Sequence, residues 1–372
     1  MSSMNRELFP VASRYAYLNN ACLVPPPRPV ANAIVEFVED IHGDGCLNAH
    51  LWQEKEEKCR SLLASLLNCE SDEIALTKNA SQGLILASES IPLCRGDMIL
   101  INDLEFPSNV YPWDLVAKRR GAIVKTIRSA VGRITCEMIK KNINRQVKAV
   151  AISSVQYLNG YKADLEAIGK LCKQHGIYLI VDATHSTGVL DVDVKRWQAS
   201  MVCGGSQTWL MSTPGLGYLY VNKNVMNNLS MANGGWKSVH EPSALSSIYE
   251  PAQNARRFED GAVSTLGIHG LVAALELIDK TGIKNIESKV LALSDELVCG
   301  LENKGYRVVS SQHEGEKSAI TLFRGGPFSS RMLKESLTES GVIVSQISQG
   351  IRVSPYFYNN SDDIAQLLNG LP

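Results

Sequence analysis

The sequence has no long apolar run and no excess of charge of either sign. No stretch approaches the roughly 18 consecutive apolar residues of a membrane-spanning helix, and the opening MSSMNRELFP lacks the basic and apolar regions of a secretory signal. Lys and Arg number 37 against 38 Asp and Glu, so charge gives no reason to expect binding to nucleic acid or an anionic membrane. We therefore expect a cytoplasmic protein with no membrane or nucleic-acid partner.

Paired cysteines are also lacking. The nine cysteines are an odd number and form no CxxC pair, which excludes an obvious disulfide framework and the usual spacing of a zinc site. We expect free, mostly buried thiols in a reducing compartment, and no metal. The cysteines are Cys22, Cys46, Cys59, Cys69, Cys94, Cys136, Cys172, Cys203 and Cys299. Internal repeats and low-complexity linkers are likewise absent from the sequence.

Short apolar strands alternate with helical segments between about residues 70 and 222. Examples of such strands are VKAVAISSV (147–155) and IYLIV (177–181). This alternation predicts an α/β fold with a mostly parallel sheet and helical crossovers. The length of 372 residues allows one large domain and a smaller one. We predict an N-terminal arm over 1–30, a large domain over 31–267 and a small α+β domain over 268–372.

A carboxylate ends one of these strands. Asp182 follows IYLIV directly, and ligands of open α/β sheets lie at the carboxyl ends of strands. A buried acid is costly unless it meets a cation. The pyridinium nitrogen of pyridoxal phosphate (PLP) is one such cation, and we expect it here.

At other strand ends, three side chains could have either a ligand-binding role or a purely structural one. Ser81 begins a helix after the turn KNASQG, where it either helps to bind a phosphate or belongs to an ordinary helix cap. Phe106 follows the strand DMILINDLE and either stacks on a flat cofactor ring or packs in the core. Asn20 follows the apolar YAYL and either reaches a site or forms an Asx turn.

Eight segments in this order and approximate spacing together resemble the class V aminotransferase family of PLP enzymes, of fold type I. The resemblance runs nearly end to end and is nearest the isopenicillin-N-epimerase-like and cystine-lyase-like branch. The segments are YLNNA (17–21), LTKNASQG (76–83), LEFPSNVYPW (104–113), SSVQYLNGYKADL (153–165), LIVDATHSTG (179–188), GSQTWLMSTPGLGYLYV (205–221), ARRFEDG (255–261) and IRVSPYFYNN (351–360).

The resemblance implies PLP as cofactor and a role for each matching residue. Asp182 matches the acid that pairs with the pyridine nitrogen and keeps it protonated, so that the ring acts as an electron sink. His185 matches the residue that hydrogen-bonds the phenolic oxygen, and Phe106 matches the residue stacked on the ring. The phosphate-binding positions match Ala80, Ser81 and Ser206.

The substrate side of the site is implied in the same way. Gln156 matches a side chain near cofactor and substrate, and Arg352 matches the arginine that binds the substrate carboxylate; Asn20 is a further substrate-side candidate. The family also implies a homodimer with shared active sites. The loop 232–265, with Gly261 and Ser264, is then the partner's contribution, and Ala262 stands where the family often has Thr.

Thr208 is the main departure from the family pattern. It occupies the position of the lysine that binds PLP as a Schiff base and transfers the proton, while its flanking residues match. Threonine does neither, and losing acid–base transfer alone costs roughly 10²- to 10⁴-fold in rate. Thr208 is either an engineered substitution that traps the substrate, or a natural feature with another base, for which Lys78 and Lys237 are candidates. In the third reading, the protein is a non-catalytic binding or scaffold protein.

The absence of a cysteine from one C-terminal segment narrows the reaction types that the sequence favours. The family includes aminotransferases, cysteine desulfurases, cystine lyase-like and epimerase-like enzymes, and kynureninases. A desulfurase needs a nucleophilic cysteine in a C-terminal loop near the arginine, and the stretch GVIVSQISQGIRVS (341–354) has none. We therefore predict an enzyme that acts at Cα or Cβ of a small-molecule α-amino acid as an aminotransferase, lyase or epimerase-like enzyme.

Overall fold

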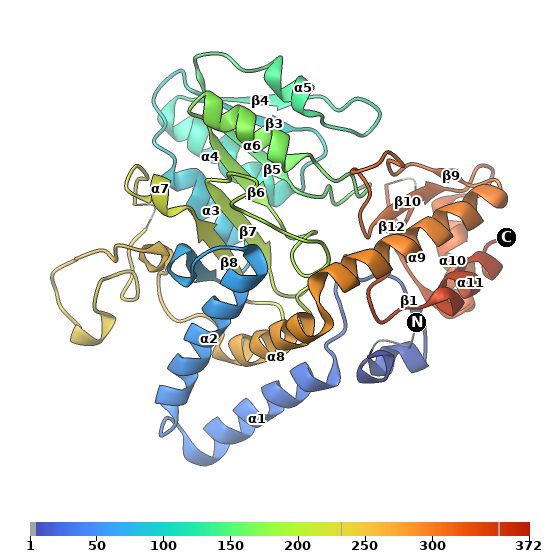
Figure 1. Cartoon of the computed structure of the whole chain (residues 1–372), viewed down its shortest axis with the longest axis horizontal. Coiled ribbons are helices and arrows are strands. Elements are labelled where there is room, and N and C mark those ends of the chain that lie inside the picture. Colours follow the sequence, from blue (N-terminus) through green and yellow to red (C-terminus); the bar gives the residue numbers. More distant parts are fainter. Residues whose placement is uncertain (1–4, 232, 349) are drawn as a thin grey trace.

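A seven-stranded sheet forms the centre of the molecule (Figure 1). The computed structural model describes residues 5–231, 233–348 and 350–372. Its strand order is β2-β8-β7-β6-β5-β3-β4, and only β8 runs antiparallel to its neighbours. The strands are β2 Ile74–Thr77, β3 Met98–Asn102, β4 Ile123–Ile127, β5 Val147–Ser153, β6 Tyr178–Asp182, β7 Met201–Gly205 and β8 Gly217–Val221. The predicted mostly parallel α/β sheet is confirmed.

Helices cover both faces of this sheet because its strands are apolar on both sides. On β3, Ile99 and Ile101 pack toward α3 and α4, whereas Leu100 belongs to the cluster on the opposite face, with α2, α6 and α8. The helices of this part are α1 Arg28–Asp44, α2 Ala49–Leu67, α3 Ala80–Ser90, α4 Tyr111–Arg120, α5 Cys136–Lys140, α6 Leu165–Gln174, α7 Lys223–Met226 and α8 Thr265–Thr281. All parallel strands therefore end at one edge, between two helical layers.

The C-terminal part is built on a second, four-stranded antiparallel sheet of order β12-β13-β10-β9. Its elements are α9 Ile283–Asn303, β9 Arg307–Val308, β10 Thr321–Arg324, α10 Ser330–Glu339, β11 Val342–Ile343, β12 Ser345–Ile347, β13 Gly350–Val353 and α11 Ser361–Asn369. Figure 1 shows α8 and α9 leading from the large sheet to this smaller one. The chain turns between them at Gly282, whose φ of +82° suits a residue without a Cβ.

The N-terminal arm is tied to the C-terminal part. Strand β1, Ala16–Tyr17, pairs in parallel with β11, and Ala16 and Leu18 belong to the same apolar cluster as α9, α10 and α11. Helix α8, which the sequence prediction placed in the small domain, has its buried side chains in the large core. The domain boundaries thus stay a prediction, and these contacts favour a later start of the small domain.

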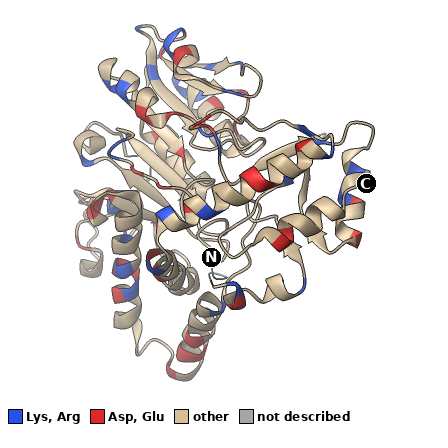
Figure 2. Cartoon of the chain, turned by 45° about the vertical axis from the view of Figure 1, so that its right-hand side comes forward, with Lys and Arg blue, Asp and Glu red and all other residues tan. Residues whose placement is uncertain are grey.

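Charge is evenly spread over the protein. Figure 2 shows acidic and basic residues interspersed on the helices. Within the described ranges, no helix has the length and apolar character needed to cross a membrane.

One buried ion pair ties α2 to the edge of the sheet. The guanidinium of Arg60 contacts both carboxylate oxygens of Glu259, and both side chains are almost fully buried. Glu259 also accepts a hydrogen bond from the backbone N–H of Leu76 in β2, at 2.8 Å. Because β2 leads into the turn before α3, this pair fixes the position of the α3 N-terminus.

Replacing one member of this pair should destabilise the fold. We expect Glu259→Gln to lower the free energy of unfolding by about 3 kcal/mol, because a buried guanidinium loses its main counter-charge. Urea unfolding followed by circular dichroism measures this. Glu166→Gln is the matched control, since Glu166 forms an exposed pair with Lys170 within one helix and should leave the midpoint nearly unchanged. Equal midpoints for the two variants would contradict the role given to Arg60 and Glu259.

Candidate active site

A cavity of about 290 Å³ opens at the carboxyl ends of β5, β6 and β7. It brings together seven of the residues expected from the sequence: Ala80, Ser81, Phe106, Asp182, His185, Thr208 and Arg352. Its other lining residues come from the N-terminal arm and from the turns after β2, β3, β5, β6 and β7: Ala21, Cys22, Asn79, Ser108, Ser153, Val155, Tyr157, Thr184, Gly205 and Gln207. Segments from both ends of the chain thus meet in one cavity.

Asp182 is a buried carboxylate at the end of β6. It accepts a hydrogen bond from the backbone N–H of Thr184 at 3.0 Å, and it has no cationic partner among the described residues. Burial raises the pKa of Asp182 to about 6, and hydrogen bonding from Thr184 offsets only part of that effect. A cation placed in the cavity against this side chain would remove the cost of ionising it.

Arg352, on β13, is a buried cation, whereas Asp182 is a buried anion. Its side chain is only 5% exposed, its Nη1 donates to the backbone carbonyl of Tyr157 at 2.9 Å, and its Nε has no partner. No described carboxylate lies within ion-pair distance of it. Burial is the main influence on Arg352 and lowers its pKa. A bidentate anion such as a carboxylate is the ligand that this guanidinium lacks.

Two further buried polar atoms in the cavity wall lack partners. These are the Nδ1 of His185 and the Oγ1 of Thr184, both in the turn that follows Asp182. Burial, and secondarily the positive charge of Arg352, lower the pKa of His185 to about 3. The imidazole is therefore neutral and can donate or accept one hydrogen bond. Buried polar groups without partners are rare in folded proteins, and they indicate a polar ligand here.

The N-terminus of α3 forms one end of the cavity. Asn79 caps this helix by accepting from the N–H of Gln82 at 2.8 Å, and the Ser81 hydroxyl lies 2.7 Å from that of Ser108. The turn packs tightly on β8, because a Cβ at Gly217 would come within 2.8 Å of the Asn79 backbone. Helix N–H groups and two hydroxyls suit a phosphate group.

Phe106 lies at the mouth of the cavity. Its side chain is 47% exposed, and its ring packs edge-on against Tyr157, with centroids 5.2 Å apart and an interplanar angle of 83°. An aromatic ring with one free face can stack on a flat cofactor ring. The alternative reading, a core phenylalanine, does not agree with this exposure.

Thr208 is buried, and its hydroxyl donates to the carbonyl of Thr184 at 3.1 Å. Among the described residues, no lysine lines the cavity. The two candidate substitutes lie elsewhere: Lys78 pairs with Asp260, and Lys237 pairs with Glu56. Neither is placed to take over the proton transfer of the missing lysine in this structure.

Gln156 lies behind the cavity wall and does not line it. It is fully buried and donates from Nε2 to Glu105 at 2.8 Å, and its Oε1 has no partner. Glu105 is a further buried carboxylate that accepts hydrogen bonds from Asn102, Asn109 and Ser153 as well. It therefore holds the strand ends of β3 and β5 together.

Two other expected phosphate-binding serines have their hydroxyls engaged. Ser206 donates to the carbonyls of Thr213 and Leu216 and is fully buried. Ser264 caps α8 by accepting from the N–H of Gly267 at 3.0 Å. Neither lines the cavity of this chain. The contribution of Ser264 to a partner's site stays a prediction.

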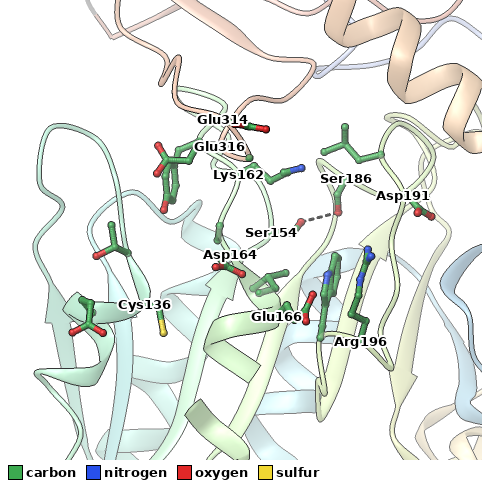
Figure 3. Close-up of a pocket in the computed structure, with 18 residues that line it drawn as sticks. Cys136, Ser154, Lys162, Asp164, Glu166, Ser186, Asp191, Arg196, Glu314 and Glu316 are labelled. Atoms are coloured by element: carbon green, nitrogen blue, oxygen red, sulfur yellow. Dashed lines mark hydrogen bonds between the residues drawn. The ribbon is translucent and has the colours of Figure 1, made fainter. Parts of the chain in front are cut away.

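A second cavity, of about 500 Å³, also lies near the strand ends (Figure 3). Ser154 and Ser186, whose hydroxyls are 2.7 Å apart, belong to its lining. Six of its lining residues are acidic and two, Lys162 and Arg196, are basic, and none of the expected site residues belongs to it. No group of three or more His, Cys, Asp or Glu side chains in the described residues could hold a metal ion.

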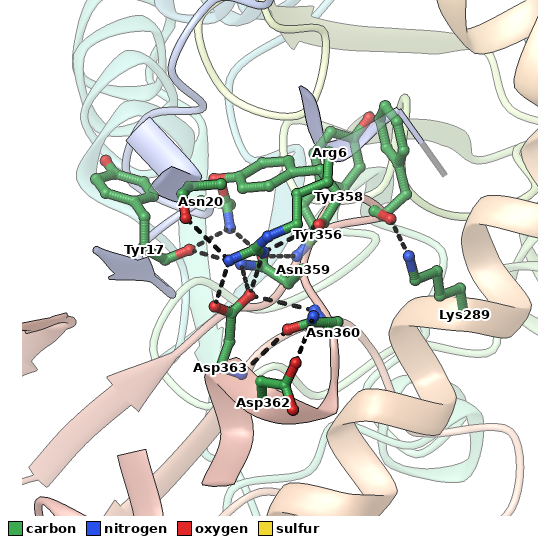
Figure 4. Close-up of polar contacts among 12 residues, drawn as sticks. Arg6, Tyr17, Asn20, Lys289, Tyr356, Tyr358, Asn359, Asn360, Asp362 and Asp363 are labelled. Atoms are coloured by element: carbon green, nitrogen blue, oxygen red, sulfur yellow. Dashed lines mark hydrogen bonds and ion pairs between the residues drawn. The ribbon is translucent and has the colours of Figure 1, made fainter. Parts of the chain in front are cut away.

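Asn20 belongs to a polar network away from the cavity (Figure 4). Its Nδ2 donates to the carbonyl of Ser354 at 2.9 Å, and its Oδ1 accepts from the Tyr358 hydroxyl at 2.9 Å. The same network joins Arg6 to Asp363 at 2.7 Å. Asn20 thus joins the N-terminal arm to the segment after β13, and direct contact with a substrate is not supported.

Seven polar or thiol-bearing lining residues were missed by sequence reasoning, namely Cys22, Asn79, Ser108, Ser153, Tyr157, Thr184 and Gln207. Each of them stands within three residues of an expected site residue. Adjacency to those expected residues was therefore a signal that could have found them. Cys22 stands two residues after Asn20, whose own side chain points into a different network.

Comparisons with known proteins agree with this geometry. The sequence profile described as aminotransferase class V matches residues 16–367. An uncharacterized aminotransferase, YcbU, of Bacillus subtilis is 25% identical over 98% of this chain and 95% of its own length. A probable cysteine desulfurase of Pyrococcus abyssi is 26% identical over 98% of this chain and 96% of its own length.

Solved structures share the fold. A cysteine desulfurase of Thermococcus onnurineus superposes with a TM-score of 0.90 at 22% identity, covering 99% of this chain and 96% of its own. A mutant of C-DES with glycine covalently linked to its PLP cofactor superposes with a TM-score of 0.91 at 21% identity, over 98% of both chains. The match of the family profile over nearly the whole length decides the classification: the chain belongs to the class V aminotransferase family of PLP enzymes.

Proposed function

We propose that the cavity binds PLP together with the carboxylate of an α-amino acid. The observation that carries this proposal is a pair of opposite buried charges, Asp182 and Arg352, in one cavity, neither of which has an oppositely charged partner among the described residues. The pyridinium of PLP supplies the cation and an amino acid supplies the anion. A phosphate at the α3 N-terminus and a ring against Phe106 would use the other polar and aromatic features of the wall.

Each side chain then has a definite task. Asp182 keeps the ring nitrogen protonated, the neutral His185 hydrogen-bonds the ring oxygen, and Ser81 contributes to the phosphate site. PLP, when bound, supplies an electron sink for bond changes at Cα or Cβ. Arg352 would bind the substrate carboxylate and so hold the substrate in one orientation in the cavity.

Thr208 is the open point of the chemistry. The C-DES mutant with glycine linked to PLP supports the idea that this fold can hold an amino acid covalently on its cofactor. We propose an aminotransferase, lyase or epimerase-like reaction. A desulfurase of the usual kind is disfavoured because the described part of 341–354 contains no thiol.

We also propose that the active protein is a cytoplasmic homodimer. Phe106 is exposed at the cavity mouth, and the loop 233–265 carries the exposed aromatic residues Trp236 and Tyr249. Large exposed aromatic side chains are typical of interfaces. A partner's loop over the mouth would cover Phe106 and bring Ser264 to the phosphate end; Ala232, at the start of the predicted loop, lies outside the described residues.

Cofactor binding tests the proposal directly. Wild-type protein mixed with PLP and desalted should keep the cofactor, measured by its absorbance, because the cavity supplies a counter-charge and a phosphate site. Asp182→Asn should weaken PLP affinity roughly 10- to 100-fold through the loss of a charge-assisted contact. Asp191→Asn, in the larger cavity, is the control and should bind like wild type. Failure of the wild type to bind PLP would leave the non-catalytic scaffold reading.

Without cofactor, Asp182 should weaken the fold above its own pKa. Its folded pKa of about 6 lies above the ordinary 3.8, so the apoprotein loses stability as pH rises from about 4 to 6. The full loss is roughly 3 kcal/mol at neutral pH. Asp182→Asn apoprotein should therefore be more stable than wild type at pH 7.5 and similar to it at pH 4. Urea unfolding at both values measures this, and an equal difference at both would contradict it.

Restoring the lysine tests the role of position 208. Thr208→Lys should attach PLP covalently, seen as a mass increase after borohydride reduction, because the amine then lies in the cavity. Thr208→Met has similar length without the amine and serves as the control. Turnover of amino acids by Thr208→Lys alone would show that Thr208 was the only block. Loss of a measurable wild-type activity in that variant would instead show a lysine-free mechanism.

A further inference from the structure

Cys22 is the one thiol that lines the candidate active site among the described residues. It lies in the turn after β1, where its N–H donates to the carbonyl of Asn19 at 3.1 Å, and its side chain is exposed. The tie between β1 and β11 holds this turn beside the cavity. Nothing in the proposed cofactor site uses the thiol.

Arg352 lines the same cavity as Cys22. The guanidinium is buried, its Nε has no partner, and it faces the same space. Burial lowers the pKa of Arg352, and the negative charge of a Cys22 thiolate is the largest influence that raises it. Both side chains line one cavity of about 290 Å³. A ligand held by its carboxylate at Arg352 has its remaining atoms within reach of this sulfur.

We propose that Cys22 is a covalent modification site of the cavity, which undergoes thiol–disulfide exchange with disulfide-bearing α-amino acids whose carboxylate is bound by Arg352. The inference rests on the proposed function for the carboxylate site, and it does not require bound PLP. The oxidised sulfur is that of the ligand, so no other oxidant is needed.

The exchange consumes one protein thiol and releases one ligand thiol. The Cys22 sulfur, after giving its proton to solvent, attacks one sulfur of the ligand disulfide. The new S–S bond forms with the thiolate electron pair while the old one breaks, and the other half of the ligand leaves as a thiolate that takes up a proton. The protein gains a mixed disulfide. It thereby holds a sulfur-bearing ligand covalently at a place other than position 208.

Three other exposed cysteines are internal controls, since Cys46, Cys94 and Cys299 do not line the cavity. The protein is treated with cystine, which carries carboxylates, or with cystamine, which does not. Peptide mass spectrometry then gives the modification rate at each cysteine. At Cys22 the ratio of the cystine rate to the cystamine rate should exceed the ratio at the control cysteines about tenfold or more, because a charge-assisted bidentate contact concentrates the carboxylate reagent.

Arg352→Gln should bring the ratio at Cys22 down to that of the controls, and Arg352→Lys should retain part of it. Absence of modification at the buried Cys59, Cys172 and Cys203 shows that a variant is folded. In the wild type, alanine should protect Cys22 from cystine and ethylamine should not, which tests the same contact without a substitution. Equal ratios at all four cysteines, or no protection by alanine, would overturn the proposal.

The result is separable from cofactor binding. Directed modification of Cys22 in a protein that fails to retain PLP would support this site and refute the proposed cofactor. Retention of PLP without directed modification of Cys22 would support the proposed cofactor and refute the proposed modification site.

Discussion

Two uncompensated charges in one buried space are the constraint on which the site depends. Asp182 and Arg352 are each costly to keep in a low-dielectric interior, and they do not pair with each other. A chain that kept only the fold could replace both with apolar residues at no loss. Their presence on β6 and β13, in two different sheets, means that the relative position of the two sheets sets the distance between cation and anion subsites.

The surrounding structure serves to fix that distance. The Arg60–Glu259 pair holds β2 and therefore the α3 N-terminus, and Glu105 ties the ends of β3 and β5 through neutral donors. Both devices use buried carboxylates whose partners are complete. Asp182 differs because its hydrogen bond from Thr184 leaves most of the charge unsatisfied. By this contrast, Glu259 and Glu105 are structural acids, whereas Asp182 is the acid that we propose binds a ligand.

The sheet was predictable from the sequence alone, because the apolar strands and the helices between them have distinct periodicities. It also placed Asp182, His185 and Arg352 at one site, because strand ends collect at one edge and the family order supplied the rest. It did not separate Asn20, Gln156 and Ser206 from the lining residues, since hydrogen bonds from segments distant in sequence decide where those side chains point. Cys22 was missed for the same reason: its position depends on a strand pairing across more than three hundred residues.

That pairing has a consequence for how the molecule opens. Because β1 lies on β11, the cavity wall includes residue 22 and residue 352, near the two ends of the chain. Local unfolding of either terminal segment therefore disrupts the ligand site. A bound ligand should stabilise the packing of both segments. Protection of both terminal segments from amide hydrogen exchange should rise together on binding, as one cooperative unit, although they are separated by nearly the whole sequence.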